Sequence, residues 1–204
     1  MADENPWLSA APPASMAPAA PVEPAEQAPF APLVAFAEEP GPPTGPPGPQ
    51  PFVSPPPAPL PRREPSHQAQ VWWLGVHGGA GESTLARLGG GAEAGGAWPV
   101  TTSGRAPVVL VARTHYSGLT AARAAATEWA SGQVPVTLLG LALVADAPGR
   151  RPKALRDLEK LVAGAVPRTW QVPWVEAWRL SEPHSQDMPG ALRRMFGQVT
   201  ALTS

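Results

Sequence analysis

The fold is decided by Val71-Trp72-Trp73-Leu74-Gly75-Val76 and the eight residues that follow it, His77-Gly78-Gly79-Ala80-Gly81-Glu82-Ser83-Thr84. The first six residues form a short apolar run, which is typical of a buried strand. The next eight, called here the glycine loop, are followed by a helical start at residues 85–88 that the glycines at 89–91 stop. The order strand, Gly-rich loop and helix predicts an α/β unit.

Outward from this stretch, strands and helical segments alternate. Apolar runs predict strands at residues 97–100, 107–112, 138–145 and 168–172. The run at 138–145 is the longest and predicts a central parallel strand, because strands buried on both faces lose their polar alternation. Helices are expected from Ser117 through Trp129, after Pro152, and along a C-terminal stripe of Leu192, Met195, Phe196 and Val199. The alternation predicts a three-layer α/β fold with an open, mostly parallel sheet, in which ligands bind beyond the carboxyl ends of the strands.

The N-terminal third has a different composition. Residues 1–65 hold 21 of the 30 prolines, and proline fixes φ and removes a backbone donor. We therefore expect residues 1–65 to be a disordered Pro/Ala-rich arm, and residues 66–204 to be the folded domain. The arm has one apolar cluster that could dock on a partner, formed by Phe30, Leu33, Val34 and Phe36.

Composition excludes several classes of protein. The chain has no cysteine, which excludes disulfides, thiolate metal sites and a cysteine nucleophile. It has no run of about 18 apolar residues and opens with the acidic Asp3-Glu4, so we expect a cytoplasmic protein with no membrane association. The net charge is −1, and the first 61 residues carry six acids and no base, which leaves +5 on the rest. That is too weakly basic for a typical nucleic-acid footprint.

The glycine loop contains the one sequence motif that indicates a specific chemistry, the binding of phosphate. A phosphate-binding loop needs small residues, free backbone N–H groups, a lysine for the phosphate charge and a hydroxyl for magnesium. The deviant Walker pattern Lys-Gly-Gly-x-Gly-Lys-Ser/Thr fits this stretch, except that His77 and Glu82 replace the two lysines. The candidate nucleotide-binding residues are Gly78, Gly79, Ala80, Gly81, Glu82, Ser83 and Thr84. We assign no catalytic and no metal-ligating residue.

The glycine loop and the segments 108–113, 138–149 and 166–179 resemble the ParA/MinD-type partition ATPases of the P-loop class. They resemble more closely an actinobacterial family of uncharacterised proteins with the same loop and the same Asp-Ala-Pro-Gly and Pro-Trp-Val-Glu-Ala-Trp-Arg segments. The resemblance covers residues 70–180 and implies a P-loop type of sheet with a nucleotide site at the loop. Beyond the missing lysines, no Asp closes a strand before Val108, where the ATPases carry the magnesium-associated acid.

The charge of Glu82 decides between an active and a disabled site. Replacing Lys by Glu changes the local charge by two units, and one unit pair 4 Å apart is worth about 1 kcal/mol in water and about 4 kcal/mol at an effective dielectric constant of 20. A carboxylate at a helix N-terminus is itself stabilised, so Glu82 could take the place of the bound anion. We expect a non-catalytic P-loop-like interaction or regulatory protein, with no cofactor and with a protein partner on the domain surface or the arm.

Two alternatives stay open. One is an unusual ATPase of ParA/MinD type that uses ATP and Mg²⁺, with Ser83 or Thr84 on the metal. The other is a DNA-associated accessory module, which rests on one basic cluster, Arg150, Arg151, Lys153 and Arg156.

Two smaller features have two interpretations each. A helical turn would align Trp170, Trp174 and Trp178 as core residues or as a partner-facing patch. Asp146 either caps the turn Asp-Ala-Pro-Gly or takes part in chemistry.

Overall fold

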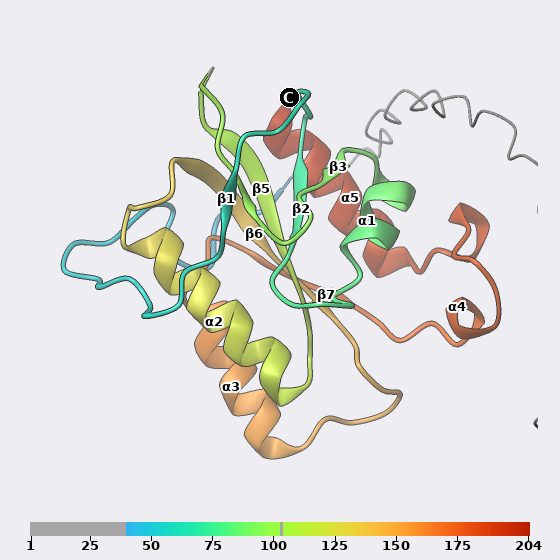
Figure 1. Ribbon diagram of the computed structural model, residues 1–204. Helices are drawn as coiled ribbons and strands as arrows, with labels where there is room; N and C mark the ends of the chain where they lie inside the picture. Colours follow the sequence, from blue (N-terminus) through green and yellow to red (C-terminus); the bar gives the residue numbers. More distant parts are fainter. Residues whose placement is uncertain (1–39, 103) are drawn as a thin grey trace, which may run out of the picture.

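The computed structural model describes residues 40–102 and 104–204 (Figure 1). Its main sheet has five parallel strands in the order β3-β2-β5-β6-β7. Their bounds are Ala92–Glu93 for β3, Trp72–Gly75 for β2, Ala106–Arg113 for β5, Val136–Val144 for β6 and Thr169–Val172 for β7. The strands predicted at 71–76, 107–112, 138–145 and 168–172 are therefore confirmed.

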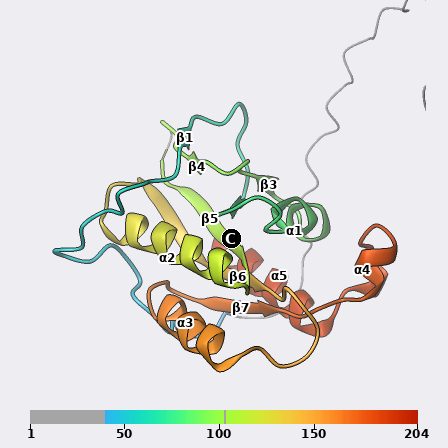
Figure 2. The same ribbon diagram turned by 60° about the horizontal axis from the view of Figure 1, so that its bottom comes forward.

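Helices cover both faces of the sheet, so the predicted three-layer α/β architecture is confirmed. Helices α2 and α3 lie on one face, and α1 and α5 lie on the other (Figures 1 and 2). Their bounds are Glu82–Gly89 for α1, Tyr116–Ala130 for α2, Lys153–Ala163 for α3 and Gly190–Thr203 for α5. The short helix α4 (Ala177–Leu180) and the 3₁₀ helix η1 (Ser185–Asp187) lie between β7 and α5.

Strand β2 shows how the sheet separates two cores. All four of its residues are buried. Because side chains alternate along a strand, Trp72 and Leu74 join the core under α2 and α3, whereas Trp73 joins the core under α1 and α5. Trp73 packs edge-on against Phe196 of α5, with the ring centroids 5.7 Å apart, and its Nε1 donates to the carbonyl of Gly90 at 2.7 Å. The unbroken apolar run thus reflects burial on both faces.

The strand predicted at 97–100 belongs to a second, smaller sheet. Strand β4 (Trp98–Pro99) pairs in parallel with β1 (Arg62–Arg63). The edge strand β3 of the main sheet was not predicted, because two residues carry no periodic pattern.

The N-terminus of α2 also differs from the expectation. The helix begins at Tyr116 and its N-cap is His115, whose Nδ1 accepts a hydrogen bond from the N–H of Gly118 at 3.0 Å. Ser117, the expected cap, already lies inside the helix. An imidazole acceptor does here what a serine hydroxyl usually does.

The prediction of disorder up to residue 65 is wrong for residues 40–65, called here the strap. The strap lies along the domain, and its backbone N–H groups donate to domain acceptors: Thr44 to the carbonyl of Pro167 at 2.9 Å and Gln50 to that of Ala130 at 2.8 Å. The residues between the prolines keep their donors, so a segment whose only strand is the two-residue β1 can still be held by the domain. The apolar cluster at residues 30–36 lies outside the described residues.

The last part of the strap is held by a buried carboxylate, Glu128 of α2. Its Oε2 accepts from the N–H of Leu60 and from Nε1 of Trp98, both at 2.9 Å. Arg62 Nη2 lies 3.5 Å from Oε1, and the side chain of Glu128 is 1% exposed. A buried charge is stable only when it is paired and hydrogen-bonded. Glu128 therefore joins the strap, the small sheet and α2.

We predict that Glu128→Ala lowers the free energy of unfolding by about 3 kcal/mol, because it leaves the buried indole N–H of Trp98 and the part-buried N–H of Leu60 without an acceptor and removes a compensated charge. Urea denaturation followed by tryptophan fluorescence measures the change. The matched control is Glu182→Ala, since Glu182 pairs with Arg87 at the exposed surface, where a loss below about 1 kcal/mol is expected. Equal losses for the two variants would contradict the role given to Glu128.

Candidate functional site

The carboxyl ends of β2, β5, β6 and β7 meet at one edge of the sheet, which lies in the lower part of Figure 1. The segments that follow these strands are the glycine loop, residues 114–115, residues 145–152 and residues 173–176. Ligands of open parallel sheets bind at such an edge. The candidate site is therefore built from these four segments.

The glycine loop connects β2 to α1 by a tight turn. Gly79 and Gly81 have φ values of 72° and 104°, in the left-handed region that glycine adopts without strain. The N–H of Ala80 donates to the carbonyl of His77 at 3.3 Å, and Gly81 is the N-cap of α1. Two of the predicted glycines are thus required by the backbone itself, whether or not a ligand binds.

The side chain of Glu82 turns back toward the end of β2. Its Oε2 accepts a hydrogen bond from the N–H of Gly75. A Cβ at Gly75 would overlap this carboxyl group and come within 3.3 Å of the Cβ of Ala80. Gly75 therefore leaves the space that the Glu82 carboxyl group fills, between the strand end and the first turn of α1.

The surroundings of Glu82 raise the pKa of its carboxyl group. Partial burial raises the pKa of the carboxyl group, the hydrogen bond from Gly75 lowers it, and the nearby charge of Glu93 raises it. Burial is the largest of the three effects, so the pKa lies above its ordinary value of 4.5. The two hydroxyl positions differ in exposure: Ser83 is exposed and Thr84 is half-buried.

The other missing lysine is replaced by a residue that ties the loop to β5. Nε2 of His77 accepts from the backbone N–H of Arg113 at 3.0 Å, and its Nδ1 lies 2.9 Å from the carbonyl of Gly78. A neutral imidazole with its proton on Nδ1 makes both bonds. Nε of Arg113 donates to the carbonyl of Gly79 at 2.9 Å. Sequence reasoning missed Arg113, since an Arg at a strand end is not a recognisable signal.

Arg113 also reaches the segment after β6. Its Nη1 lies 3.9 Å from Oδ1 of Asp146. The backbone N–H of Asp146 donates to Oγ1 of Thr114, which is buried, at 3.2 Å. Asp146 thus lies in the candidate site and pairs loosely with an arginine there.

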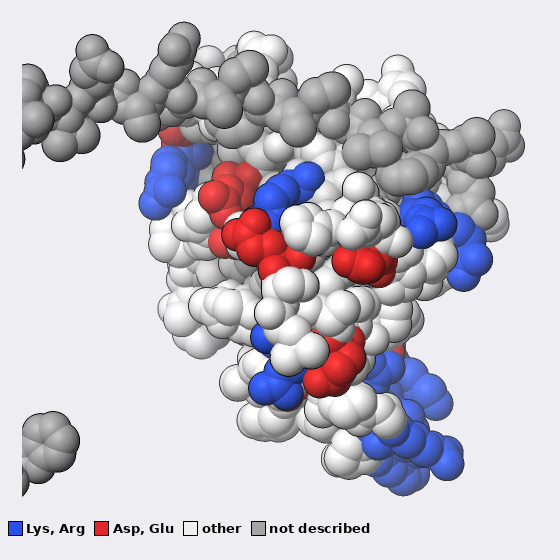
Figure 3. Space-filling model, turned by 90° about the vertical axis from the view of Figure 1, so that its right-hand side faces the viewer, with Lys and Arg blue, Asp and Glu red and all other residues white. Residues whose placement is uncertain are grey.

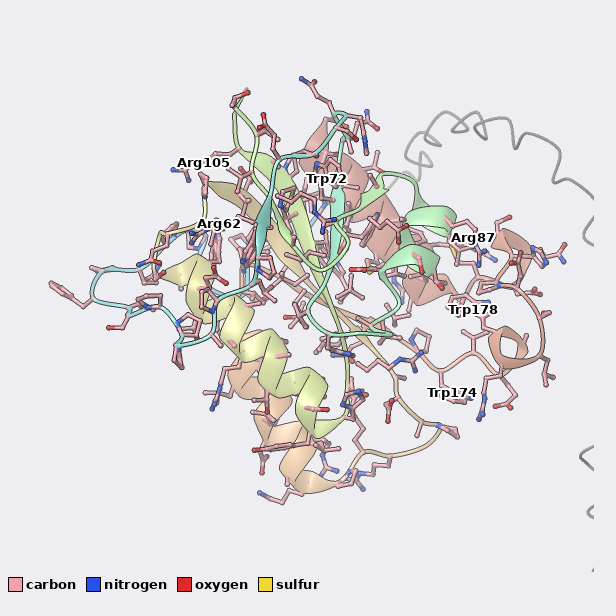
Figure 4. The ribbon with its side chains drawn as sticks, viewed as in Figure 1. Arg62, Trp72, Arg87, Arg105, Trp174 and Trp178 are labelled. Carbon is pink, nitrogen blue, oxygen red and sulfur yellow. The ribbon has the colours of Figure 1, made fainter. Side chains whose placement is uncertain are left out.

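The three tryptophans do not share a helical face, so that prediction is wrong. Trp170 is buried in β7, Trp174 follows the strand, and Trp178 lies in α4 (Figure 4). The strand ends at Val172, and the residue after it is a proline, which restricts the backbone. Trp174 and Trp178 are half-buried and line a hollow at the sheet edge.

Two adjoining hollows at this edge form what we call the arginine cleft. The first has a volume of ≈ 340 Å³ and is lined by Arg113, Asp146, Trp178 and Arg179, among others. The second has a volume of ≈ 420 Å³ and is lined by Arg150, Arg151, Arg156 and Gln171, among others. Three residues line both hollows: Ala145, Pro173 and Trp174.

Basic side chains gather at the lower end of the face shown in Figure 3, and the strands of the main sheet finish toward the lower end in Figure 1. The sequence pointed to the cluster at 150–156 but not to Arg113 and Arg179, which the fold adds to it. Within residues 40–102 and 104–204, no group of three or more His, Asp or Glu residues is placed to hold a metal ion.

The fold and the site define an α/β domain with a parallel sheet and a glycine loop at its carboxyl edge. The chain belongs to the family of unknown function DUF6668, whose sequence profile matches residues 69–196. Searches of the curated proteins and of the solved structures found no match. No helix in the described part of the chain is long and apolar enough to cross a membrane.

The raised pKa of Glu82 predicts a pH dependence of stability. Between the unfolded value and the raised folded value, the folded state binds more protons than the unfolded state, so stability falls as the pH rises through this window. Glu82→Gln keeps an oxygen that can accept from Gly75 and removes the charge. We expect the variant to be more stable than the parent at pH 7 and equal to it below pH of about 4.

Urea midpoints of both proteins across this pH range measure the difference. Comparison with the parent at each pH cancels the titration of the other acids. A difference that does not change with pH would contradict the burial of the carboxyl group.

Proposed function

We propose that this protein is a non-catalytic, P-loop-like interaction or regulatory protein in which the nucleotide site is disabled. The observation that carries the proposal is the hydrogen bond from the N–H of Gly75 to the carboxyl group of Glu82. In a working phosphate-binding loop, a lysine at this position would supply positive charge to the phosphates. Here an acid lies at the same helix start and accepts the hydrogen bond of the N–H at the end of β2.

The surroundings of Glu82 support this proposal on electrostatic grounds. A polyphosphate brought to the first turn of α1 would meet a carboxyl group in place of an ammonium group. If the carboxyl group ionised, the repulsion per unit pair would be between about 1 and 4 kcal/mol at 4 Å. The free N–H groups of a single helix turn contribute less than this for an exposed anion, about 0.3 to 1 kcal/mol.

The contacts of His77 and Arg113 support it on structural grounds. Arg113 is a cationic side chain in direct contact with the loop, since its Nε donates to the carbonyl of Gly79. His77 uses both ring nitrogens for backbone contacts. Both side chains therefore stabilise the conformation of the loop without a bound phosphate, as expected if the loop serves only to connect β2 to α1.

We predict that the parent chain does not bind ATP or GTP with a Kd below about 1 mM in the presence of Mg²⁺, which corresponds to less than about 4 kcal/mol of binding free energy. Glu82→Lys should bind the same nucleotides measurably more tightly, because it reverses the charge at the loop. Isothermal titration calorimetry measures both. The matched control is Glu64→Lys, an exposed site with the same change of charge that lies outside the carboxyl edge of the sheet.

Magnesium-dependent ATP or GTP turnover by the parent chain would overturn the proposal in favour of an ATPase of ParA/MinD type. Equal gains in Glu82→Lys and Glu64→Lys would show a general charge effect and would contradict the loop geometry.

A further inference from the structure

The arginine cleft is the feature of the described chain that the proposed function leaves without a role. Five arginines line it: Arg113, Arg150, Arg151, Arg156 and Arg179. Three carboxylates line or contact the cleft. Asp146 lies 3.9 Å from Arg113, and Glu159 pairs with Arg151. Glu176 accepts a hydrogen bond from Trp174. The five cations against three acids leave an excess of two positive charges.

Several arginines in the cleft still have free donors. Arg156 uses Nη1 for the carbonyl of Arg151, and Arg151 uses Nη2 for Glu159 and Gln171. A guanidinium group has five N–H donors, so each keeps others for a ligand. The guanidinium group of Arg179 lies 5.5 Å from the ring of Trp174. The cleft can therefore bind carboxylates beside a flat aromatic surface.

The chain itself contains a segment with the complementary chemistry. Residues 1–39 carry six acids and no base, together with eight prolines. Proline rings pack on tryptophan in aromatic grooves that bind polyproline II segments, and carboxylates pair with arginine. The segment Pro21-Val22-Glu23-Pro24-Ala25-Glu26 combines both groups.

We propose that residues 21–26 dock in the arginine cleft of the same molecule, with Pro24 against Trp174 and with Glu23 and Glu26 on the arginines of the two hollows. In polyproline II geometry, residues three apart lie on one side of the segment, about 9 Å from each other. Trp174 lines both hollows, so it is the shared surface between the two groups of arginines.

The anchoring of the strap sets which acids can reach the cleft. The carbonyl of Gly41 accepts from Arg168, directly before β7, whereas Trp174 follows the other end of that strand. A four-residue strand is about 13 Å long. Glu38 and Glu39 are within two residues of Pro40 and reach at most about 7 Å. Glu26 is 14 residues before Pro40, and a chain of that length spans up to about 45 Å.

The absence of native cysteine allows a direct test in the full chain. A nitroxide spin label on Gln27→Cys should broaden the indole N–H signal of Trp174 in the NMR spectrum and leave that of Trp129, buried in α2, unchanged. The signal of Trp174 is assigned with Trp174→Phe. In about 1 M salt, where the Debye length is about 3 Å, the broadening should be lost.

Two variants of the arm separate this contact from a general attraction. Glu23→Gln with Glu26→Gln should abolish the broadening, and Asp3→Asn with Glu4→Gln, which removes the same charge, should retain it. Neither pair lies in the domain, so the fold does not limit the experiment.

Three results would overturn the proposal: no broadening at Trp174, equal loss in the two double variants, or broadening that appears in mixtures of labelled and unlabelled chains and increases with concentration. The last would show docking between two copies. None of these results bears on nucleotide binding, so this proposal and the proposed function can fail separately.

Discussion

Burial of β2 on both faces is the constraint on which the site depends. With Trp73 in one core and Trp72 and Leu74 in the other, the strand can neither rotate nor shift by one residue without exposing a large apolar group. The parallel pairing of β2 with β5 then places the ends of both strands at one edge. The glycine loop that follows β2 therefore lies next to Arg113 at the end of β5.

A nucleotide-binding edge would place a glycine turn and cationic groups together. In this protein the glycine loop and the arginine cleft hold these two features apart. At the loop, the turn explains why glycine is needed at positions 79 and 81, where φ is positive. The carboxyl group of Glu82 accepts the hydrogen bond of the N–H at the strand end. Cationic groups are instead concentrated beyond β6 and β7. A multiply charged anion would therefore be attracted to a different part of this edge from the one that the glycine motif marks.

Much of the fold was predictable from the sequence because long apolar runs report burial directly. The run at 138–145 became β6, and the run before the glycine loop became β2. The strap was not predictable by the same reasoning, because several of its contacts join backbone N–H groups to carbonyls far away in the sequence, and such contacts leave no pattern in side chains. Within the site, the glycines and Glu82 were visible as a motif, whereas Arg113 and Arg179 line one hollow only because the fold brings the end of β5 close to α4.

The contacts of the strap explain how a segment this rich in proline, residues 40–65, is held against the domain. Glu128 lies in α2, far in sequence from Leu60, and holds it through a buried acceptor that the apolar surroundings strengthen. The contacts at Pro167 and Ala130 fix the strap at two further points. Residues 1–39 are therefore tethered at a defined point beside the start of β7, which raises their effective concentration at the domain surface. Because this tether lowers the entropic cost of bringing the arm to the domain, a contact between them can form even if its intrinsic affinity is weak.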